Sequence, residues 1–490
     1  MASADITTGG SAKGERVWDR VRALMASDNG PKPVEATPDE DGRVTDDVLK
    51  PDSQRKRERF IPVTRTALLD RLTIESAWKP GEAAHARRFF RYLDYWRQQQ
   101  YNSRLLDLEQ SYEPFSPDSE LLQTRGFSPA DKNTLQRRVL VSIQRLLEQA
   151  NYERIDPRDV SLILTRDSHY GLDFKVDMDA FEEIMLYYRG ASNQKFERRR
   201  LSKYMRKEEF DVPIFRRFFM LFKLKPFEVR VEEIMHKDNM TREQAEKRIK
   251  SLREDLPPGI TEGNIYLKLF KNIPRNDLEM VFPNTQIKFL FRDKLRLGLT
   301  AGGGIGAGAA GAAGKIALLV TSPLAAIPAV AGLGGIIFRQ AMGFVNQKQK
   351  YLVVMAQKLY SHTLADNRGV ILQIAAAAME QDIKEEMLLY SVLAKERATR
   401  GELPAVDHAI EQYLTGTFGV KVDFDIYDAL DRLVRDGIVK EAQDGTLMTF
   451  SPADAAKYID GKWDLFLDQL PDPGQGVGTE LEGSMPGESA

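Results

Sequence analysis

The chain has 490 residues, with 70 Lys and Arg against 72 Asp and Glu, and no cysteine. This near balance of charge argues against a globally basic nucleic-acid binder, and the missing cysteine excludes disulfides, thiolate metal sites and cysteine nucleophiles. The five histidines lie far apart and none belongs to a helical pair, so we expect no zinc site, and no cofactor or catalytic residue is assigned. These histidines are His85, His169, His236, His362 and His408.

The two ends of the chain are predicted to be disordered. Residues 1–57 are rich in Gly, Pro, Asp, Ser and Lys, and residues 471–490 are rich in Gly, Pro and Glu. The N-terminus has no apolar segment of the kind that a secretory signal contains. Everything before residue 297 is therefore expected to stay on the side of the membrane where it is made.

Residues 58–165 are predicted to form a mostly helical region. Thr66 is a candidate cap for a first helix, and apolar residues recur at helical spacing from Glu82 to about Gln110. A third helix is expected to open at Ser128-Pro129-Ala130-Asp131, which supplies a cap, a first-turn proline and an acid at the third helical position.

Residues 166–294 are predicted to form an antiparallel sheet region. Apolar and charged residues alternate in 172–176 and again in 182–190, and this period of two is typical of strands. A helical insertion is expected at 226–260, where Thr241-Arg242-Glu243-Gln244 has the sequence of a capping box. Further strands are predicted at 212–222, 265–270 and 287–291.

The stretch from Leu297 to Phe338 carries a single ionisable side chain, Lys315. A bilayer core about 30 Å thick needs roughly 20 helical residues to cross it, so this length predicts a two-helix transmembrane hairpin over 295–342. Thr321-Ser322-Pro323 is the expected turn. A single span over 316–338 and a buried helix pair are the alternatives. Candidate membrane helix-packing glycines stand at GxxxG spacing: Gly298, Gly302 and Gly306, and also Gly304 and Gly308.

Basic residues flank this stretch on both sides, which favours both flanks on the cytoplasmic side and an even number of crossings. They are Lys288, Arg292, Lys294 and Arg296 before it and Arg339, Lys348 and Lys350 after it. The predicted localisation is integral membrane, in a bacterial inner membrane with the N- and C-terminal domains cytoplasmic. Residues 306–311 match GxGxxG, but no strand precedes them, so a dinucleotide site is not expected.

Residues 343–400 are predicted to form long amphipathic helices, and residues 401–470 a winged-helix-like module. In this module two helices precede a hairpin with Asp444-Gly445 at its turn. The second helix, at 426–436, has several acids that would repel DNA phosphates, so the module is expected to contact protein or to pack within the chain. Those acids are Asp428, Asp431 and Asp436, together with Asp425 directly before the helix.

Two clusters of charge leave alternatives open. Glu380, Glu385 and Glu386 suggest acid–base or two-metal chemistry, but the apolar residues between them also fit an ordinary amphipathic helix. The densest basic run would contact anionic lipid headgroups, form a solvated hairpin face or bind RNA. That run is Lys195, Arg198, Arg199, Arg200, Lys203, Arg206 and Lys207.

A family resemblance rests on Glu58 to Leu72, Tyr187 to Gly190, Phe215 to Lys223 and, above all, Tyr266 to Met280. These segments resemble the transmembrane protein 143 family, whose members share a domain of unknown function. The resemblance extends over about residues 58–470. It implies an integral membrane protein, and it supplies no activity, cofactor or catalytic residue.

The predicted fold class is an α+β membrane protein: a helical N-terminal region, an antiparallel β-sheet region, a two-helix transmembrane hairpin and a helical C-terminal domain with a winged-helix-like end. The leading functional hypothesis is a membrane-tethered scaffold or interaction protein. Its expected partners are the lipid bilayer, a protein that binds the module, and further copies of the chain through the Gly-rich span, but not nucleic acid.

The alternative is a membrane-associated, hydrolase-like enzyme with a site between the sheet and the Glu380 helix. An oligomeric channel is a third interpretation, although the predicted spans offer few polar residues to line a pore. Those residues are Thr300, Lys315, Thr321 and Ser322.

Overall fold

A computed structural model of the chain describes residues 57–118, 126–155, 172–199, 207–254, 256–257, 259–274, 278, 281–283, 285–289 and 359–469. The α-helices are α2 (Arg65–Leu72), α3 (Glu82–Tyr112), α4 (Pro129–Gln149), α6 (Phe227–Asp238), α7 (Arg242–Glu254), α10 (Asn367–Leu393), α11 (Leu403–Phe418), α12 (Ile426–Arg435) and α13 (Pro452–Asp464). The strands are β1 (Glu153–Ile155), β2 (Leu172–Val176), β3 (Phe181–Arg199), β4 (Lys207–Leu224), β5 (Ile265–Pro274), β6 (Thr285–Phe289), β7 (Thr363–Asp366), β8 (Ala398–Thr399), β9 (Val439–Glu441) and β10 (Thr446–Thr449).

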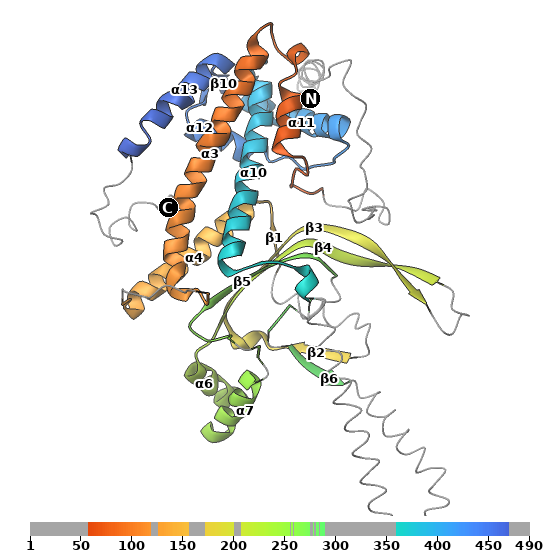
Figure 1. Cartoon of the computed structure of the whole chain (residues 1–490), viewed down its shortest axis with the longest axis vertical. Coiled ribbons are helices and arrows are strands. Elements are labelled where there is room, and N and C mark those ends of the chain that lie inside the picture. Colours follow the sequence, from red (N-terminus) through yellow and green to blue (C-terminus); the bar gives the residue numbers. More distant parts are fainter. Residues whose placement is uncertain are drawn as a thin grey trace, which may run out of the picture.

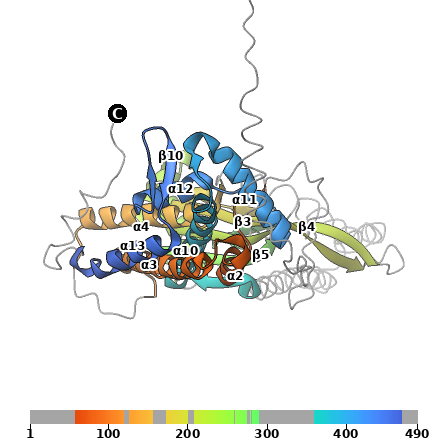
Figure 2. The ribbon, with the colours of Figure 1, turned by 90° about the horizontal axis from the view of Figure 1, so that it is seen from above.

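Two long helices, α3 and α10, lie side by side and form the spine of the molecule (Figure 1). Around one end of this spine gather α2 from the N-terminal part and α11, α12 and α13 from the C-terminal part (Figures 1 and 2). One apolar core joins these elements, because it contains Leu68 and Phe90 together with Leu388, Leu430 and Ile459. Residues from the two ends of the described chain therefore share one hydrophobic core.

The main sheet crosses the other end of the spine, with strand order β1-β3-β4-β5-β7 and antiparallel pairing throughout. β3 and β4 continue beyond the other strands as a two-stranded ribbon that projects from the body (Figure 1). The main sheet is antiparallel, as predicted, but the set of strands that form it differs from the prediction. β2 and β6 pair with each other in a separate sheet, and the main sheet gains β1 and β7 from outside 166–294.

The two faces of the main sheet have different covers. Tyr187 and Phe219, which lie opposite each other on β3 and β4, belong to the core beneath α4 and α10. Leu186 and Phe218 point the other way and pack with Phe282 in a separate core. This alternation follows from the period of two in an extended strand.

Local signals in the sequence predict several element ends correctly. Ser128 caps α4 and forms a capping box with Asp131. Thr241 and Gln244 exchange two hydrogen bonds at the start of α7. Gly445, with φ of 78°, closes the turn between β9 and β10. Each of these signals depends only on residues within one turn of the chain.

Two local predictions are corrected. Thr64 and not Thr66 caps α2, because the Thr64 side chain accepts a hydrogen bond from the Ala67 backbone N–H. The long helices predicted over 343–400 are interrupted by a strand, since Thr363–Asp366 is β7 and pairs with β5. Tertiary pairing with the sheet overrides the apolar periodicity there.

The C-terminal module follows the predicted order of helices and hairpin. α11 and α12 precede β9 and β10, and Ser451 caps α13 by accepting from the Asp454 backbone N–H. β8, which follows α10, completes a small sheet of order β8-β10-β9. The end of α10 thus serves as the first helix of this winged-helix-like arrangement.

The transmembrane fold class and the inner-membrane localisation predicted from the sequence are corrected. Among the residues that the structure describes, no helix has both the length and the apolar composition needed to cross a bilayer. The physical reason is visible in α10, which has 27 residues but carries Asp382, Lys384, Glu385 and Glu386 in its second half. The stretch 295–342, on which the hairpin was predicted, lies outside the described residues.

Phe89→Ala is expected to lower the free energy of unfolding by about 3–5 kcal/mol, because it empties a fully buried position. The Phe89 ring lies 4.3 Å from that of Tyr390, so its loss should also weaken the C-terminal helices that pack on α10. Hydrogen exchange followed by mass spectrometry should show faster exchange in α11 to α13 as well as in α3. Leu106→Ala, at a position on α3 that is 66% exposed, is the control and should change stability by less than about 0.5 kcal/mol. Faster exchange confined to α2 and α3 would contradict the shared core.

Candidate functional site

The second half of α10 carries a run of ionisable residues that are almost fully buried. The exposed fractions are 2% for Asp382, 1% for Lys384, 3% for Glu385 and 0% for Glu386. The sequence suggested an ordinary amphipathic helix here, and the structure corrects this, because neighbouring elements cover α10 on several sides. A buried carboxylate needs a charged or hydrogen-bonding partner, so the partners of these residues define the site.

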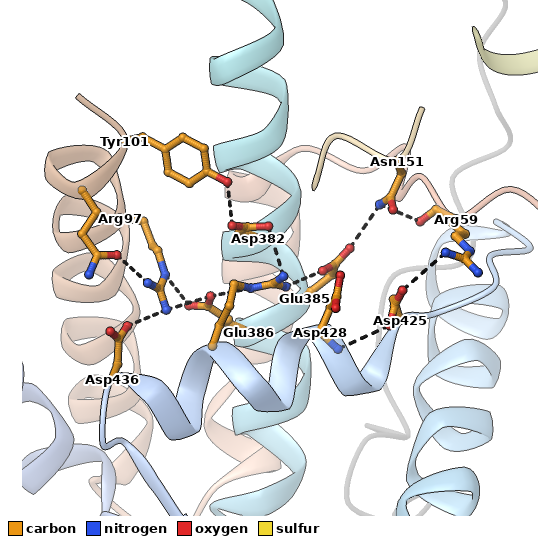
Figure 3. A network of polar contacts seen from close by, with 12 residues as sticks. Arg59, Arg97, Tyr101, Asn151, Asp382, Glu385, Glu386, Asp425, Asp428 and Asp436 are labelled. Atoms are coloured by element: carbon orange, nitrogen blue, oxygen red, sulfur yellow. Dashed lines mark hydrogen bonds and ion pairs between the residues drawn. The ribbon is translucent and has the colours of Figure 1, made fainter. Parts of the chain in front are cut away.

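Arg432 on α12 contacts three carboxylates of α10, which are labelled in Figure 3 as Asp382, Glu385 and Glu386. Its Nε donates to Glu386 Oε1 at 2.9 Å and its Nη2 to Glu385 Oε2 at 2.5 Å. Its Nη1 lies 3.3 Å from Asp382 Oδ1. The planar guanidinium thus presents three nitrogens to three acids of α10.

Arg97 on α3 binds the same group of acids from the other side (Figure 3). Its Nε donates to Glu386 Oε2 at 2.9 Å. Its Nη2 lies 2.9 Å from Glu386 Oε1 and 2.5 Å from Asp436 Oδ2, at the end of α12. We call the six side chains that meet here the ionic layer: Arg97, Asp382, Glu385, Glu386, Arg432 and Asp436.

The ionic layer holds four carboxylates and two guanidiniums, so it has an excess of acid. Tyr101 donates to Asp382 Oδ2 at 2.6 Å, and Asn151 donates to Glu385 Oε1 at 3.2 Å. Burial raises the pKa of Glu385 to about 7, against the opposing effect of Arg432. Burial alone would lower the pKa of Arg432, but its three acids raise it well above its usual value. Arg432 therefore stays charged. Glu385 holds a proton up to about pH 7, which reduces the excess of negative charge in the layer.

A segment that we call the strap, residues 57–63, crosses α10 next to the ionic layer. Lys384 Nζ donates to the backbone oxygens of Ile61 at 2.8 Å and Val63 at 3.1 Å, and lies 3.3 Å from Glu380 Oε1. The Gln381 side chain accepts from the Ile61 N–H at 3.4 Å. Burial lowers the pKa of Lys384. Gln381 and Lys384, about one helical turn apart on α10, thus fix the strap through its backbone.

The start of the strap lies on acids of the C-terminal module. Arg57 Nη1 donates to Glu411 Oε2 on α11 at 2.6 Å. Arg59 Nη1 lies 3.6 Å from Asp425 Oδ2, just before α12. Burial, together with Glu411 and Asp423, raises the pKa of Asp407 on α11 to about 7. This surface of the module is therefore strongly acidic, and the basic strap meets it.

The ionic layer has some of the properties that acid–base catalysis requires, since carboxylates converge and one titrates near neutrality. Every acid of the layer, however, is in contact with Arg97 or Arg432, which occupy the space between the carboxylates. Within the described ranges, no three His, Cys, Asp or Glu side chains gather in a way that could hold a metal ion. The arrangement fits a permanent clamp between α3, α10 and α12.

The residues singled out in the sequence are placed as follows. Glu385 and Glu386 come together in the ionic layer, whereas the side chain of Glu380 is 42% exposed and contacts Lys384. Lys288 lies on β6 with its backbone opposite Asp173. Outside the described residues lie the other proposed membrane-flanking residues and the packing glycines, namely Arg292, Lys294, Arg296, Arg339, Lys348, Lys350, Gly298, Gly302, Gly304, Gly306 and Gly308.

Sequence reasoning missed Arg97, Asp382 and Lys384 as members of the site. No local signal distinguishes Arg97 from the other arginines of α3, and its partner Glu386 is 289 residues away. The sequence analysis gave Asp436 only as one of the acids of the second helix of the module, and the structure buries both Asp436 and Arg432.

Comparison with known proteins assigns no activity to this site. A family model described as a protein of unknown function, DUF3754, matches residues 181–369, which run from the start of β3 to the first turn of α10. The ionic residues of α10 and α12 follow the matched segment in the sequence. No solved structure matches the chain.

Arg432→Met is expected to lower the free energy of unfolding by about 3–5 kcal/mol, because it leaves buried carboxylates without their main partner. The measurement is urea unfolding followed by circular dichroism. Arg435→Met is the matched control on the same helix, since Arg435 is exposed, and it should change stability by about 0.5 kcal/mol or less. Equal effects of the two substitutions would rule out a clamp centred on Arg432.

Glu385→Gln is expected to change the pH dependence of folding. The folded protein holds a proton on Glu385 up to about pH 7, whereas a carboxyl with the ordinary pKa of 4.5 loses it earlier. The stabilising effect of this proton is complete below about pH 4.5 and is lost as the pH rises through about 7. Glutamine cannot ionise, so the variant should gain stability relative to the wild type between about pH 5 and about pH 8, by up to about 3 kcal/mol.

Urea unfolding of the wild type and of E385Q at about pH 5 and at about pH 8 measures this difference in stability. Glu243→Gln, at an exposed position on α7, is the control and should show the same difference from the wild type at each pH. A pH-independent difference for E385Q would show that Glu385 is ionised throughout the range.

Proposed function

We propose that this chain is a protein-interaction scaffold, and that its winged-helix-like module binds a basic, amphipathic helical segment of a partner protein through the outer face of α12. The observation that carries the proposal is the composition of that face. Tyr427 and Val434, seven residues apart and so on one side of the helix, are 52% and 39% exposed. Asp428 and Asp431 lie exposed between them. Two apolar anchors among acids are complementary to a helix with apolar and basic residues.

The charge of this face argues against nucleic acid as the ligand. A helix that enters a DNA groove must supply cations to neutralise phosphates. Of the two arginines of α12, Arg432 is buried against α10 and is committed to the ionic layer. Arg435 alone is left on the exposed side, against Asp428 and Asp431. The face would therefore repel a phosphate backbone.

The strap provides an example, within this chain, of how a basic segment meets the module. Arg57 and Arg59 contact Glu411 and Asp425 at the edge of the surface that α12 continues. The backbone of the strap also joins the module, since the Asp423 N–H donates to the Glu58 carbonyl at 3.0 Å. A partner segment with arginine or lysine at similar spacing would find Asp428 and Asp431 next along the same surface.

A scaffold needs its binding surface held rigidly, and the ionic layer supports this requirement. Arg432 ties the inner side of α12 to α10, while Asp436 ties its end to α3 through Arg97. The outer face is thus presented by a helix whose inner face is fixed at several points. A rigid surface loses less entropy on binding than a mobile one.

A photo-crosslinking amino acid placed at Tyr427 or Val434 of the full chain tests the proposal in cells that produce it. We expect adducts with protein at both positions, and we expect mass spectrometry to map them to a basic peptide. The double substitution Asp428→Lys and Asp431→Lys should reduce the adduct yield roughly tenfold, because two charge pairs are reversed.

The same crosslinker at Lys457, an exposed position on α13, is the control and should give none of these adducts. Adducts with nucleic acid, equal adducts at Lys457, or a yield that charge reversal does not change would overturn the proposal. Absence of adducts at both test positions would overturn it as well.

A further inference from the structure

A second cluster of charge, of the opposite sign, lies where the strap meets the main sheet. Arg189 on β3 and Arg217 on β4 stand directly opposite each other in the strand pairing. Tyr187 and Phe219, two residues along each strand, are likewise opposite and face the core beneath α10. Because side chains alternate along a strand, both arginines lie on this same face of the sheet.

Arg189 is held in a well-defined place. Its guanidinium carbon lies 4.1 Å from the ring centre of Phe60 in the strap and 4.9 Å from that of Tyr152, so two aromatic rings contact it. Its Nη1 donates to the Ala150 carbonyl at 3.2 Å. Burial, and secondarily the charge of Arg217, lowers the pKa of Arg189. The guanidinium is thus oriented and partly desolvated.

Neither of these arginines has an acid partner within the described part of the chain. No described carboxylate lies within 4.0 Å of Arg189 or Arg217, although Glu58 and Glu380 act on Arg189 from farther away. Arg217 Nη1 donates to the Arg216 carbonyl at 2.9 Å. Arg216 is the next residue along β4 and therefore lies on the opposite face of the sheet, where it is 3.8 Å from Glu58. On the face beneath α10, the cluster thus holds two guanidiniums and no carboxylate partner among the described residues.

Two like charges directly opposite on neighbouring strands destabilise a sheet. The strap increases this electrostatic repulsion, because Phe60 shields Arg189 from water and Lys384 adds a further cation near Arg189. An anion between the guanidiniums would turn this repulsion into two attractions. A phosphate group suits the position, because its oxygens match the fork of a guanidinium and its double charge balances both arginines.

We propose that Arg189 and Arg217 bind a phosphate group between the strap and the main sheet, either as free inorganic phosphate or as the phosphate monoester of a small molecule. Arg189, held in contact with the rings of Phe60 and Tyr152, orients the group, and Arg217 supplies the second positive charge. This site does not involve the outer face of α12, so the result of its test does not depend on the proposed protein contact.

Thermal unfolding of the full chain at constant ionic strength tests the site, with inorganic phosphate in one arm and glycerol 1-phosphate in the other. The wild type should show a saturable rise in Tm in at least one arm. Saturation by inorganic phosphate alone identifies a free-phosphate site, and saturation by glycerol 1-phosphate identifies a monoester site. Arg217→Gln should weaken binding by roughly tenfold or more, as expected for loss of a charge-assisted contact.

The same Tm measurements distinguish a phosphate site from a purely structural role of the two arginines. If the arginines serve only to balance nearby acids, R217Q lowers the Tm measured without phosphate, and phosphate leaves the Tm of the wild type unchanged. If they form a ligand site, R217Q has the same or a higher Tm without phosphate, because the repulsion of Arg189 is relieved.

Arg154→Gln on β1 is the matched control, because Arg154 is exposed and its removal should leave the phosphate response intact. Should R217Q fail to fold, Arg189→Lys replaces it, since lysine keeps the charge and loses the fork, and it too should weaken binding. No saturable response of the wild type in either arm, or an unchanged response in the arginine variants, would overturn the proposal.

Discussion

The structure depends on the burial of more acid than base at the middle of one helix. Asp382, Glu385 and Glu386 leave water when α10 enters the core, and Arg97 and Arg432 are the cations that make this burial tolerable. One cation comes from α3 and the other from α12. The N-terminal and C-terminal parts of the described chain must therefore both be in place before α10 can be fully covered, which couples these parts electrostatically as well as through their shared apolar core.

How far the sequence predicts this fold depends on the range of the signals involved. The capping box at Ser128 and the turn at Gly445 each lie within a few residues, and both are correctly predicted. The ionic layer is different, since Arg97 and Glu386 are 289 residues apart and Arg432 follows Glu386 by 46. From sequence alone, charged residues on a helix are interpreted as a solvent-exposed face, because the elements that cover the helix are not known. The charges of α10 were misjudged for that reason, as was the membership of the main sheet.

Lys384 stands at the boundary between two zones of opposite charge. On one side the ionic layer has more carboxylates than guanidiniums, and on the other Arg189 and Arg217 lie opposite each other on neighbouring strands. The strap spans both zones, because Arg59 reaches Asp425 and the next residue, Phe60, covers Arg189. Its backbone is fixed between them by Lys384. The strap is therefore placed to respond to a change of charge in either zone.

The inward orientation of Arg432 also sets the charge of the outer face of α12. A short helix has few positions, and those that face α10 are not available to a ligand. With Arg432 turned inward to satisfy three acids, the outer face keeps Asp428 and Asp431 and a single arginine, Arg435. The same interaction that stabilises the core thus removes the cation that a groove-reading helix would use on phosphate. In this module the demands of folding set the electrostatic character of the exposed face, and that character supports the proposed contact with a basic protein segment.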